Sequence, residues 1–91
     1  MNEFINKIEL QGVVGAVGGG TFSLCTEHSY ENVGERIVEV MWHSCVYFGE
    51  KEIKKGDWVH LVGRPRMKRY IGDDGEPRLH YEVIVNKIDI L

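Results

Sequence analysis

The sequence has little of what marks a secreted mini-protein or a membrane protein. It contains only two cysteines, Cys25 and Cys45, and two prolines. Two cysteines are too few for a disulfide framework and could form one disulfide at most, and we expect instead two buried free thiols in a reducing compartment. No stretch approaches the ~18 apolar residues that span a bilayer, and the first residues lack a signal-peptide core. We therefore expect a cytoplasmic protein without a membrane partner.

Catalytic motifs are also lacking. There is no P-loop, no Gly-x-Ser-x-Gly and no His-Glu-x-x-His. The glycines at 18–20 precede a strand pattern, so they lack the helix N-terminus that would hold a phosphate. Four residues could supply zinc ligands, but their spacing is not that of a familiar zinc knuckle, and small core thiols explain the cysteines better: Cys25, His28, His43 and Cys45. We expect no metal, no cofactor and no enzymatic activity.

Helical patterns are nearly absent, whereas strand patterns recur along the chain. The longest helical candidate, Gly49–Gly56, allows one or two turns at most. Five strands are expected, at Lys7–Val14, Phe22–Thr26, Arg36–Phe48, Trp58–Ile71 and Leu79–Ile90. Loops are expected at Gly18–Gly20 and Tyr30–Glu35, a hairpin turn at Gly72–Gly75, and a bend or bulge near an exposed edge at Gly63 and Pro65. The pattern predicts one all-β domain over residues 1–91, a five-stranded OB-fold barrel with long hairpin loops.

Charge is unevenly distributed along the chain. The formal net charge of −3 is the wrong sign for a generic polybasic nucleic-acid binder. Residues 1–50 have only two basic residues, whereas residues 58–72 have four and no acid: Arg64, Arg66, Lys68 and Arg69. Arg64, Arg66 and Lys68 share strand parity, so we expect their charged groups on one face. The Debye length at physiological salt is about 8 Å, so this basic patch acts locally whatever the distant acids do.

Aromatic residues lie where stacking on a ligand is favoured. Trp42 and Phe48 are six residues apart, which places them on one face of the expected third strand. Tyr30 lies in a polar segment, and Tyr70 follows Lys68 and Arg69. Basic residues interleaved with exposed aromatics are typical of single-stranded nucleic-acid binding, in which each stacked base contributes about 1–3 kcal/mol.

Six segments, in order, resemble the bacterial single-stranded DNA-binding protein family over essentially the whole chain. They are N-K-I-E-L-Q-G (6–12), F-S-L-C-T-E-H-S-Y-E (22–31), W-H-S-C-V-Y-F-G (42–49), K-K-G-D-W-V-H-L-V-G (54–63), R-M-K-R-Y-I-G-D-D-G (66–75) and H-Y-E-V-I-V (80–85). The resemblance implies base stacking on Tyr30, Trp42, Phe48 and Tyr70. It also implies a homo-oligomer, with the first strand (Ile8, Leu10) and His43 at subunit contacts.

The resulting hypothesis is sequence-nonspecific binding of single-stranded DNA in replication, recombination or repair. Its expected phosphate contacts are Lys7, Lys55, Arg64, Arg66, Lys68, Arg69 and Arg78. The sequence leaves open whether RNA is also bound and whether the oligomer is a dimer or a tetramer.

Three departures from the family pattern favour a second interpretation. The connection at Glu50–Lys55 is much shorter than the family's helix-bearing segment, so that helix is expected to be short or absent. No acidic C-terminal tail for recruiting partner proteins is expected, and Trp58 stands where the family usually has a polar residue. The alternative is a primosomal replication protein B-like or other OB-fold interaction module, with DNA binding secondary.

Overall fold

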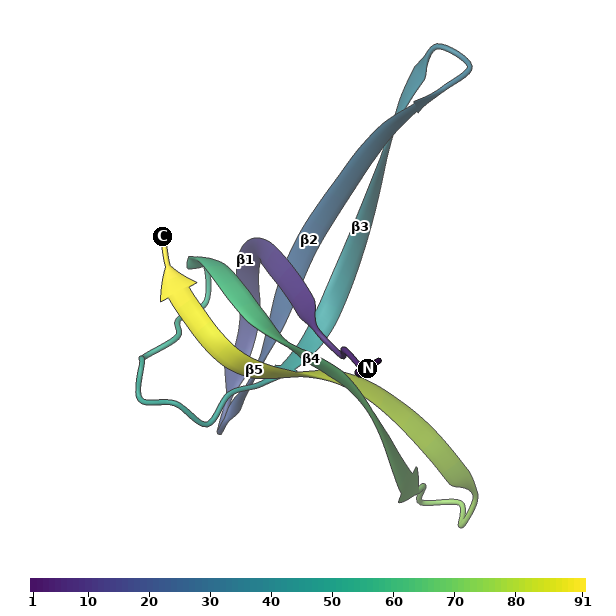
Figure 1. Ribbon diagram of the computed structural model, residues 1–91, viewed down its shortest axis with the longest axis vertical. Coiled ribbons are helices and arrows are strands. Elements are labelled where there is room, and N and C mark those ends of the chain that lie inside the picture. The colour runs from purple at the N-terminus through teal and green to yellow at the C-terminus, as the bar shows by residue number, and fades with distance from the viewer.

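The computed structural model describes all residues, 1–91, and contains five β-strands and no helix. The strands are β1 (Ile8–Gly18), β2 (Thr21–Asn32), β3 (Glu35–Val46), β4 (Trp58–Ile71) and β5 (Pro77–Ile90). They close into a barrel in the order β1-β2-β3-β5-β4 (Figure 1). All neighbours are antiparallel except β3 and β5, which pair in parallel. The predicted all-β, five-stranded OB-fold barrel is confirmed. Because the chain forms no helix, it has no helix that could cross a membrane.

The barrel encloses a single small apolar core of ten buried residues. Its strand members alternate as a sheet with one inward face requires, except that the bulge opposite Val62 and Gly63 places Val85 and Ile88 three positions apart. The ten are Val14, Phe22, Leu24, Cys45, Ile53, Val59, Leu61, Val83, Val85 and Ile88. Ile53 is the one member outside the strands and comes from the irregular segment 47–57 between β3 and β4. This segment is fastened to β1 by the Gly56 amide, which donates to the Val14 carbonyl at 2.8 Å. The helix that was expected to be short or absent between the third and fourth strands is therefore absent, and the buried side chain of Ile53 lies on an irregular loop in its place.

Two pairs of strands continue beyond the barrel as arms. The β2–β3 arm (residues 26–41) extends past Cys25, the last residue of β2 that pairs with β1. The β4–β5 arm (residues 66–82) extends past Val83, where β5 leaves β3. Figure 1 shows the two arms projecting from the barrel in different directions, with the N-terminus near the start of the β4–β5 arm. The long hairpins expected from the sequence are thus strand-paired arms rather than open loops.

Some predicted boundaries are wrong. The segment Tyr30–Glu35 was expected to be a loop, but β2 continues to Asn32, which pairs with Glu35 across a two-residue turn. That turn is formed by Val33 and Gly34, both with positive φ (51° and 78°). Polar side chains here indicate solvent on the arm rather than the end of a strand. The third strand ends at Val46, so Phe48 lies outside it.

The bounds of the fourth strand agree with prediction, and the expected irregularity is a β-bulge between Val62 and Gly63. The expected edge is also present, because β4 pairs with β1 only as far as Gly63, and from Arg64 onward, Pro65 included, it pairs with β5 alone.

Gly63 of β4 lies directly against the backbone of β5. A Cβ on this residue would overlap the carbonyl oxygen of Ile84 on β5, a backbone atom that cannot move aside cheaply. We predict that Gly63→Ala lowers the free energy of unfolding by about 1–3 kcal/mol or more, because overpacking at a backbone contact must displace the strand. Urea denaturation followed by circular dichroism measures this change.

Gly19→Ala is the matched control, because a Cβ there meets nothing within 4 Å and the residue does not have a positive φ. It should change stability by no more than about 0.5 kcal/mol. Equal stability of the two variants would contradict the role assigned to Gly63.

Candidate nucleic-acid interface

Trp42 is held as a flat platform on the outer surface of the barrel. Its side chain leaves β3, and its six-membered ring reaches Gly15 of β1, where a Cβ would lie 2.9 Å from Cη2. Gly15 therefore leaves room for the indole to rest on the sheet. The side chain is still 59% exposed, so one face of the ring remains open to a ligand.

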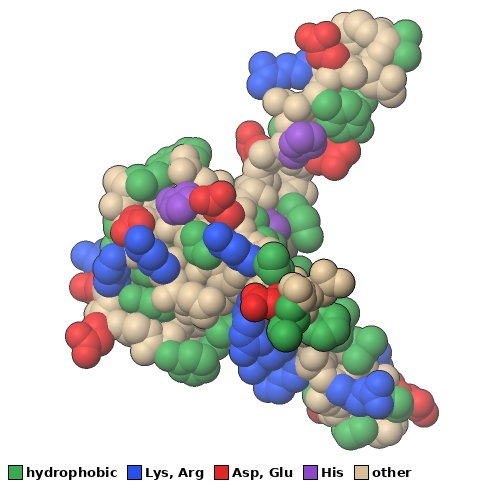
Figure 2. All heavy atoms as spheres, viewed as in Figure 1, with side chains coloured by type: hydrophobic (Ala, Val, Ile, Leu, Met, Phe, Trp, Pro, Cys, Tyr) green, Lys and Arg blue, Asp and Glu red, His purple; other side chains and the backbone are tan.

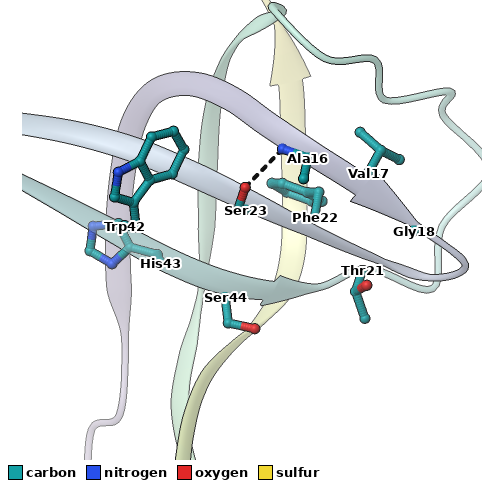
Figure 3. A pocket seen from close by; sticks show the side chains of 9 residues that line it. All are labelled: Ala16, Val17, Gly18, Thr21, Phe22, Ser23, Trp42, His43 and Ser44. Atoms are coloured by element: carbon teal, nitrogen blue, oxygen red, sulfur yellow. Dashed lines mark hydrogen bonds between the residues drawn. The ribbon is translucent and has the colours of Figure 1, made fainter.

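An open groove of about 500 Å³ lies beside Trp42 and runs along β1 and β2 (Figure 3). A β-bulge between Val14 and Val17 frees the Ala16 amide from the strand ladder, and this amide donates to Ser23 Oγ at 2.8 Å. Hydroxyls of Thr21, Ser23 and Ser44 line the groove. The groove thus offers an aromatic platform with hydrogen-bonding groups beside it, which suits a planar polar ring.

Phe48 lies after the end of β3 rather than on the Trp42 strand. Tyr47 donates its amide to Gly20 O at 3.0 Å, which places the following residue at the β1–β2 turn. Phe48 is 81% exposed and packs little against the protein. The prediction that Trp42 and Phe48 share one strand face is therefore wrong: Trp42 lies on β3, and Phe48 follows the strand, next to the β1–β2 turn.

Tyr30 lies on the β2–β3 arm and does not share a face with Trp42. Trp42 pairs with Cys25, and Tyr30 is five residues further along β2, so the two side chains leave opposite faces of the ribbon. The Tyr30 ring stacks on His28, with centroids 6.0 Å apart and an interplanar angle of 29°. Tyr30 is a separate stacking position, out along the arm.

The β4–β5 arm carries the predicted basic strip. Arg64, Arg66, Lys68 and Tyr70 alternate along β4 and so share its outer face. Their cross-strand partners on β5 are Ile84, Glu82, His80 and Arg78. Figure 2 shows Lys and Arg side chains gathered where this arm leaves the barrel. Tyr70, near the end of the arm, lines a hollow of about 470 Å³ together with Arg78.

Arg66 is engaged within the protein by a buried acid. Its Nε donates to Glu82 Oε1 at 2.8 Å, and its Nη2 donates to the same oxygen. Glu82 is only 6% exposed. The hydrogen bond from Arg66 lowers the pKa of Glu82 against the opposing effect of burial, and Arg66, His80 and Lys68 add favourable charge. The carboxylate thus stays ionised inside the basic strip.

The remaining basic residues predicted to contact phosphate are dispersed. Lys7 lies near the base of the strip, since Asn6 donates to Pro65 O at 3.1 Å. Lys55 lies on the turn beside Gly56, at the other end of the barrel segment of β4. Arg69 points to the opposite face of the arm from the strip, and Arg78 is paired with Asp74 at 2.6 Å. The sequence therefore predicted more cations for one surface than the fold brings together.

The residues expected at subunit contacts pack within their own chain. Ile8 and Leu10 are half-buried against the core. His43 is buried, with Nε2 2.8 Å from Thr26 Oγ1 and Nδ1 without a partner, and burial lowers its pKa. Both cysteines are free, as expected, but only Cys45 is buried, and Cys25 is partly exposed. Burial raises the pKa of Cys45 to about 12, which keeps its thiol protonated and unreactive.

The four potential zinc ligands do not form a cluster. His43 and Cys45 lie on the inner face of β3, whereas Cys25 points outward. No three His, Cys, Asp or Glu side chains lie together in a metal-binding arrangement.

Sequence reasoning missed three residues that shape this surface. Gly15 and Ser23 support the Trp42 platform, and Glu82 holds Arg66. Only the strand register brings each of them to its partner. The one sequence signal was the break in alternation at Gly15, which coincides with the β1 bulge.

No family model matches the chain. Its sequence is 29% identical over 77 residues to single-stranded DNA-binding proteins from Neisseria meningitidis serogroup A and serogroup B. The match covers 77% of this chain and 44% of each relative. The chain thus matches less than half the length of these relatives.

Solved structures extend the similarity to the fold. A Plasmodium falciparum single-stranded DNA-binding protein, solved in complex with single-stranded DNA, superposes with a TM-score of 0.79 at 29% identity over 100% of this chain and 97% of that one. A small single-stranded DNA-binding protein from Streptomyces coelicolor shares the fold, with a TM-score of 0.65 at 17% identity over 99% and 95% of the two chains. Sequence and fold together confirm the predicted resemblance to the bacterial single-stranded DNA-binding proteins.

Proposed function

We propose that this chain is a non-catalytic protein that binds single-stranded DNA without sequence specificity. The observation that carries the proposal is the Trp42 platform, a ring held on Gly15 with its other face open above a groove. A planar aromatic stacks on any base, since every base has a π-face. A role in replication, recombination or repair belongs to the same proposal, by similarity to the relatives described above.

The proposed path of the DNA visits three places. Bases stack on the barrel at Trp42 and Phe48, on Tyr30 of the β2–β3 arm, and on Tyr70 of the β4–β5 arm. The phosphates contact Arg64 and Lys68, for which the structure has no ion pair, with Lys7 at the base of the strip. Arg69 and Lys55 lie away from this surface and contact phosphates only where the DNA continues past it. Arg66 and Arg78 are each paired with an acid of this chain, which offsets their charge.

The two tryptophans can be tested separately. Trp58→Phe leaves Trp42 as the only indole, and Trp42→Phe leaves Trp58. We predict that oligo-dT strongly quenches the fluorescence of the Trp58→Phe variant and hardly affects the Trp42→Phe variant. Trp42→Ala should weaken binding by about 1–3 kcal/mol, the contribution of one stacked base.

Duplex DNA of the same length is the control, since its bases are not free to stack on the protein. Equal affinity for duplex and single strand, or no quenching of Trp42 at low salt, would overturn the proposal.

The phosphate contacts can be counted by salt dependence. If about four phosphates are neutralised, log K should fall with log salt at a slope near −3. We predict that the double variant Arg64→Ala, Lys68→Ala makes the slope shallower by about 1.4, since each single-strand phosphate contact contributes about 0.7. Lys54→Ala, an exposed cation on the 54–57 turn and outside the proposed set, should leave the slope unchanged. Equal slopes for the double variant and the Lys54→Ala control would show that the basic strip does not contact the phosphates.

We also propose that the chain forms a homo-oligomer, because two features on the β1 side of the barrel favour a second copy. Trp58 is 56% exposed and borders a cavity of about 300 Å³ with Gln11, Val13 and Cys25. The first half of β1, Ile8–Gly12, pairs with β4 but has no strand on its other side. A second subunit would meet this free edge and Trp58 rather than the inward side chains of Ile8, Leu10 and His43.

We predict that Trp58→Glu shifts the sedimentation coefficient toward that of the monomer, because a carboxylate would have to be buried at the contact. Ile71→Glu is the control, since Ile71 is as exposed as Trp58 but lies at the tip of the β4–β5 arm. Sedimentation of the wild type as a monomer at every concentration would reject self-association.

A further inference from the structure

Glu82 is the one acid on the outer face of the basic strip, and it is nearly inaccessible to solvent. It pairs with Arg66 across β4 and β5, and the neighbouring pair on the same face is Lys68 with His80. Its other carboxylate oxygen, Oε2, lies 3.8 Å from His80 Nε2. The carboxylate is thus surrounded by three basic side chains of the strip.

We propose that Glu82 is a charge-balancing residue of the DNA interface, which holds Arg66 and limits the affinity for single-stranded DNA. This inference rests on the proposed function and deepens it. According to this inference, one buried acid determines how many cations of the strip are available to phosphate.

The geometry of Arg66 supports this role. Nε and Nη2 of Arg66 are both directed at one carboxylate oxygen, so the Nε–Nη2 edge of the guanidinium is already occupied and its positive charge is balanced by the carboxylate. An approaching phosphate therefore meets a neutral pair. It meets full positive charge only at Arg64 and Lys68, one alternation away on either side.

The position of the pair explains why an acid is retained there. The β4–β5 arm lies beyond the last contact of β5 with β3 and so beyond the apolar core. Cross-strand side-chain pairs then become a main source of stability for the ribbon. Without Glu82, the base of the arm would hold the cations Arg64, Arg66 and Lys68 with no acid among them. Glu82 relieves their mutual repulsion at the expense of one phosphate contact.

The test is Glu82→Gln, which keeps an acceptor for Arg66 and removes only the charge. Binding to oligo-dT is measured at fixed pH over a range of salt concentrations. We expect the variant to bind more tightly, roughly fivefold at 0.1 M salt, with a slope steeper by about 0.7, the increment for one more single-strand phosphate contact. Glu52→Gln, which removes an equal charge from the exposed 47–57 segment, should change neither quantity.

The double variant Arg66→Gln, Glu82→Gln provides a second test, which does not depend on the release of a cation. Because it removes a pair that is already neutral, it should keep the wild-type slope. Arg66→Gln alone should bind more weakly than the wild type, since Glu82 would then repel phosphate. Thermal unfolding verifies that each variant is folded.

Weaker or unchanged binding by Glu82→Gln would overturn the charge-balancing role. So would a slope shallower by about 0.7 in the double variant, which would mean that Arg66 contacts phosphate in the wild type. If the wild type itself shows no salt-dependent binding, the proposed function fails and this inference fails with it. If the wild type binds single-stranded DNA in a salt-dependent manner but Glu82→Gln does not differ from it, only the inference fails.

Discussion

The architecture depends on the closure of a small barrel by a very short contact. β3 and β5 pair at only two positions, Cys45 with Val83 and Val46 with Ile84. The barrel thus closes around ten core residues, yet its strands have 11 to 14 residues. At about 3.3 Å per residue, a 14-residue strand extends to about 46 Å, close to the 47 Å longest dimension of the molecule. Residues that do not fit around the core must continue as two-stranded arms.

This division assigns different physical roles to the two parts. On the barrel, a functional side chain can rest on a rigid sheet, and Trp42 does so because Gly15 presents no Cβ beneath it. On the arms there is no core to hold a side chain in place, so residues there depend on cross-strand and same-strand neighbours. Tyr30 stacks on His28, and Arg66 is bound by Glu82. Each arm therefore uses part of its own binding chemistry to remain ordered.

The sequence predicts the barrel well because its signals are local. Alternation and turn residues define the five strands, and the bounds of β4 agree with prediction. Prediction fails where the structure of a segment depends on residues that are distant in the sequence. The polar segment around Tyr30 resembles a loop, but it forms a strand because its partner on β3 pairs with it out in solvent. Phe48 shares strand parity with Trp42, yet β3 has ended before it.

The candidate site shows the same limit more sharply. The basic strip could be predicted, since residues of equal parity on one strand share a face. Whether each cation is free could not, because Glu82 is 16 positions away from Arg66 along the chain and meets it only through the β4–β5 register. The ten-residue core, too, includes Ile53, which no strand pattern identifies.

The charge of the chain illustrates why counting residues is a poor guide to nucleic-acid binding. The net charge of −3 includes acids on the barrel and at the arm tips. Salt screens the interaction of these distant acids with a phosphate bound at the strip. Even within the strip, the number of cations overstates the charge offered to a phosphate, because Arg66 is neutralised by Glu82. Affinity then depends on a few free cations and on stacking at about 1–3 kcal/mol per base, and stacking does not depend on the sign of the net charge. An acidic protein can therefore present a surface suited to a polyanion, provided that its aromatics are held open and its free cations lie beside them.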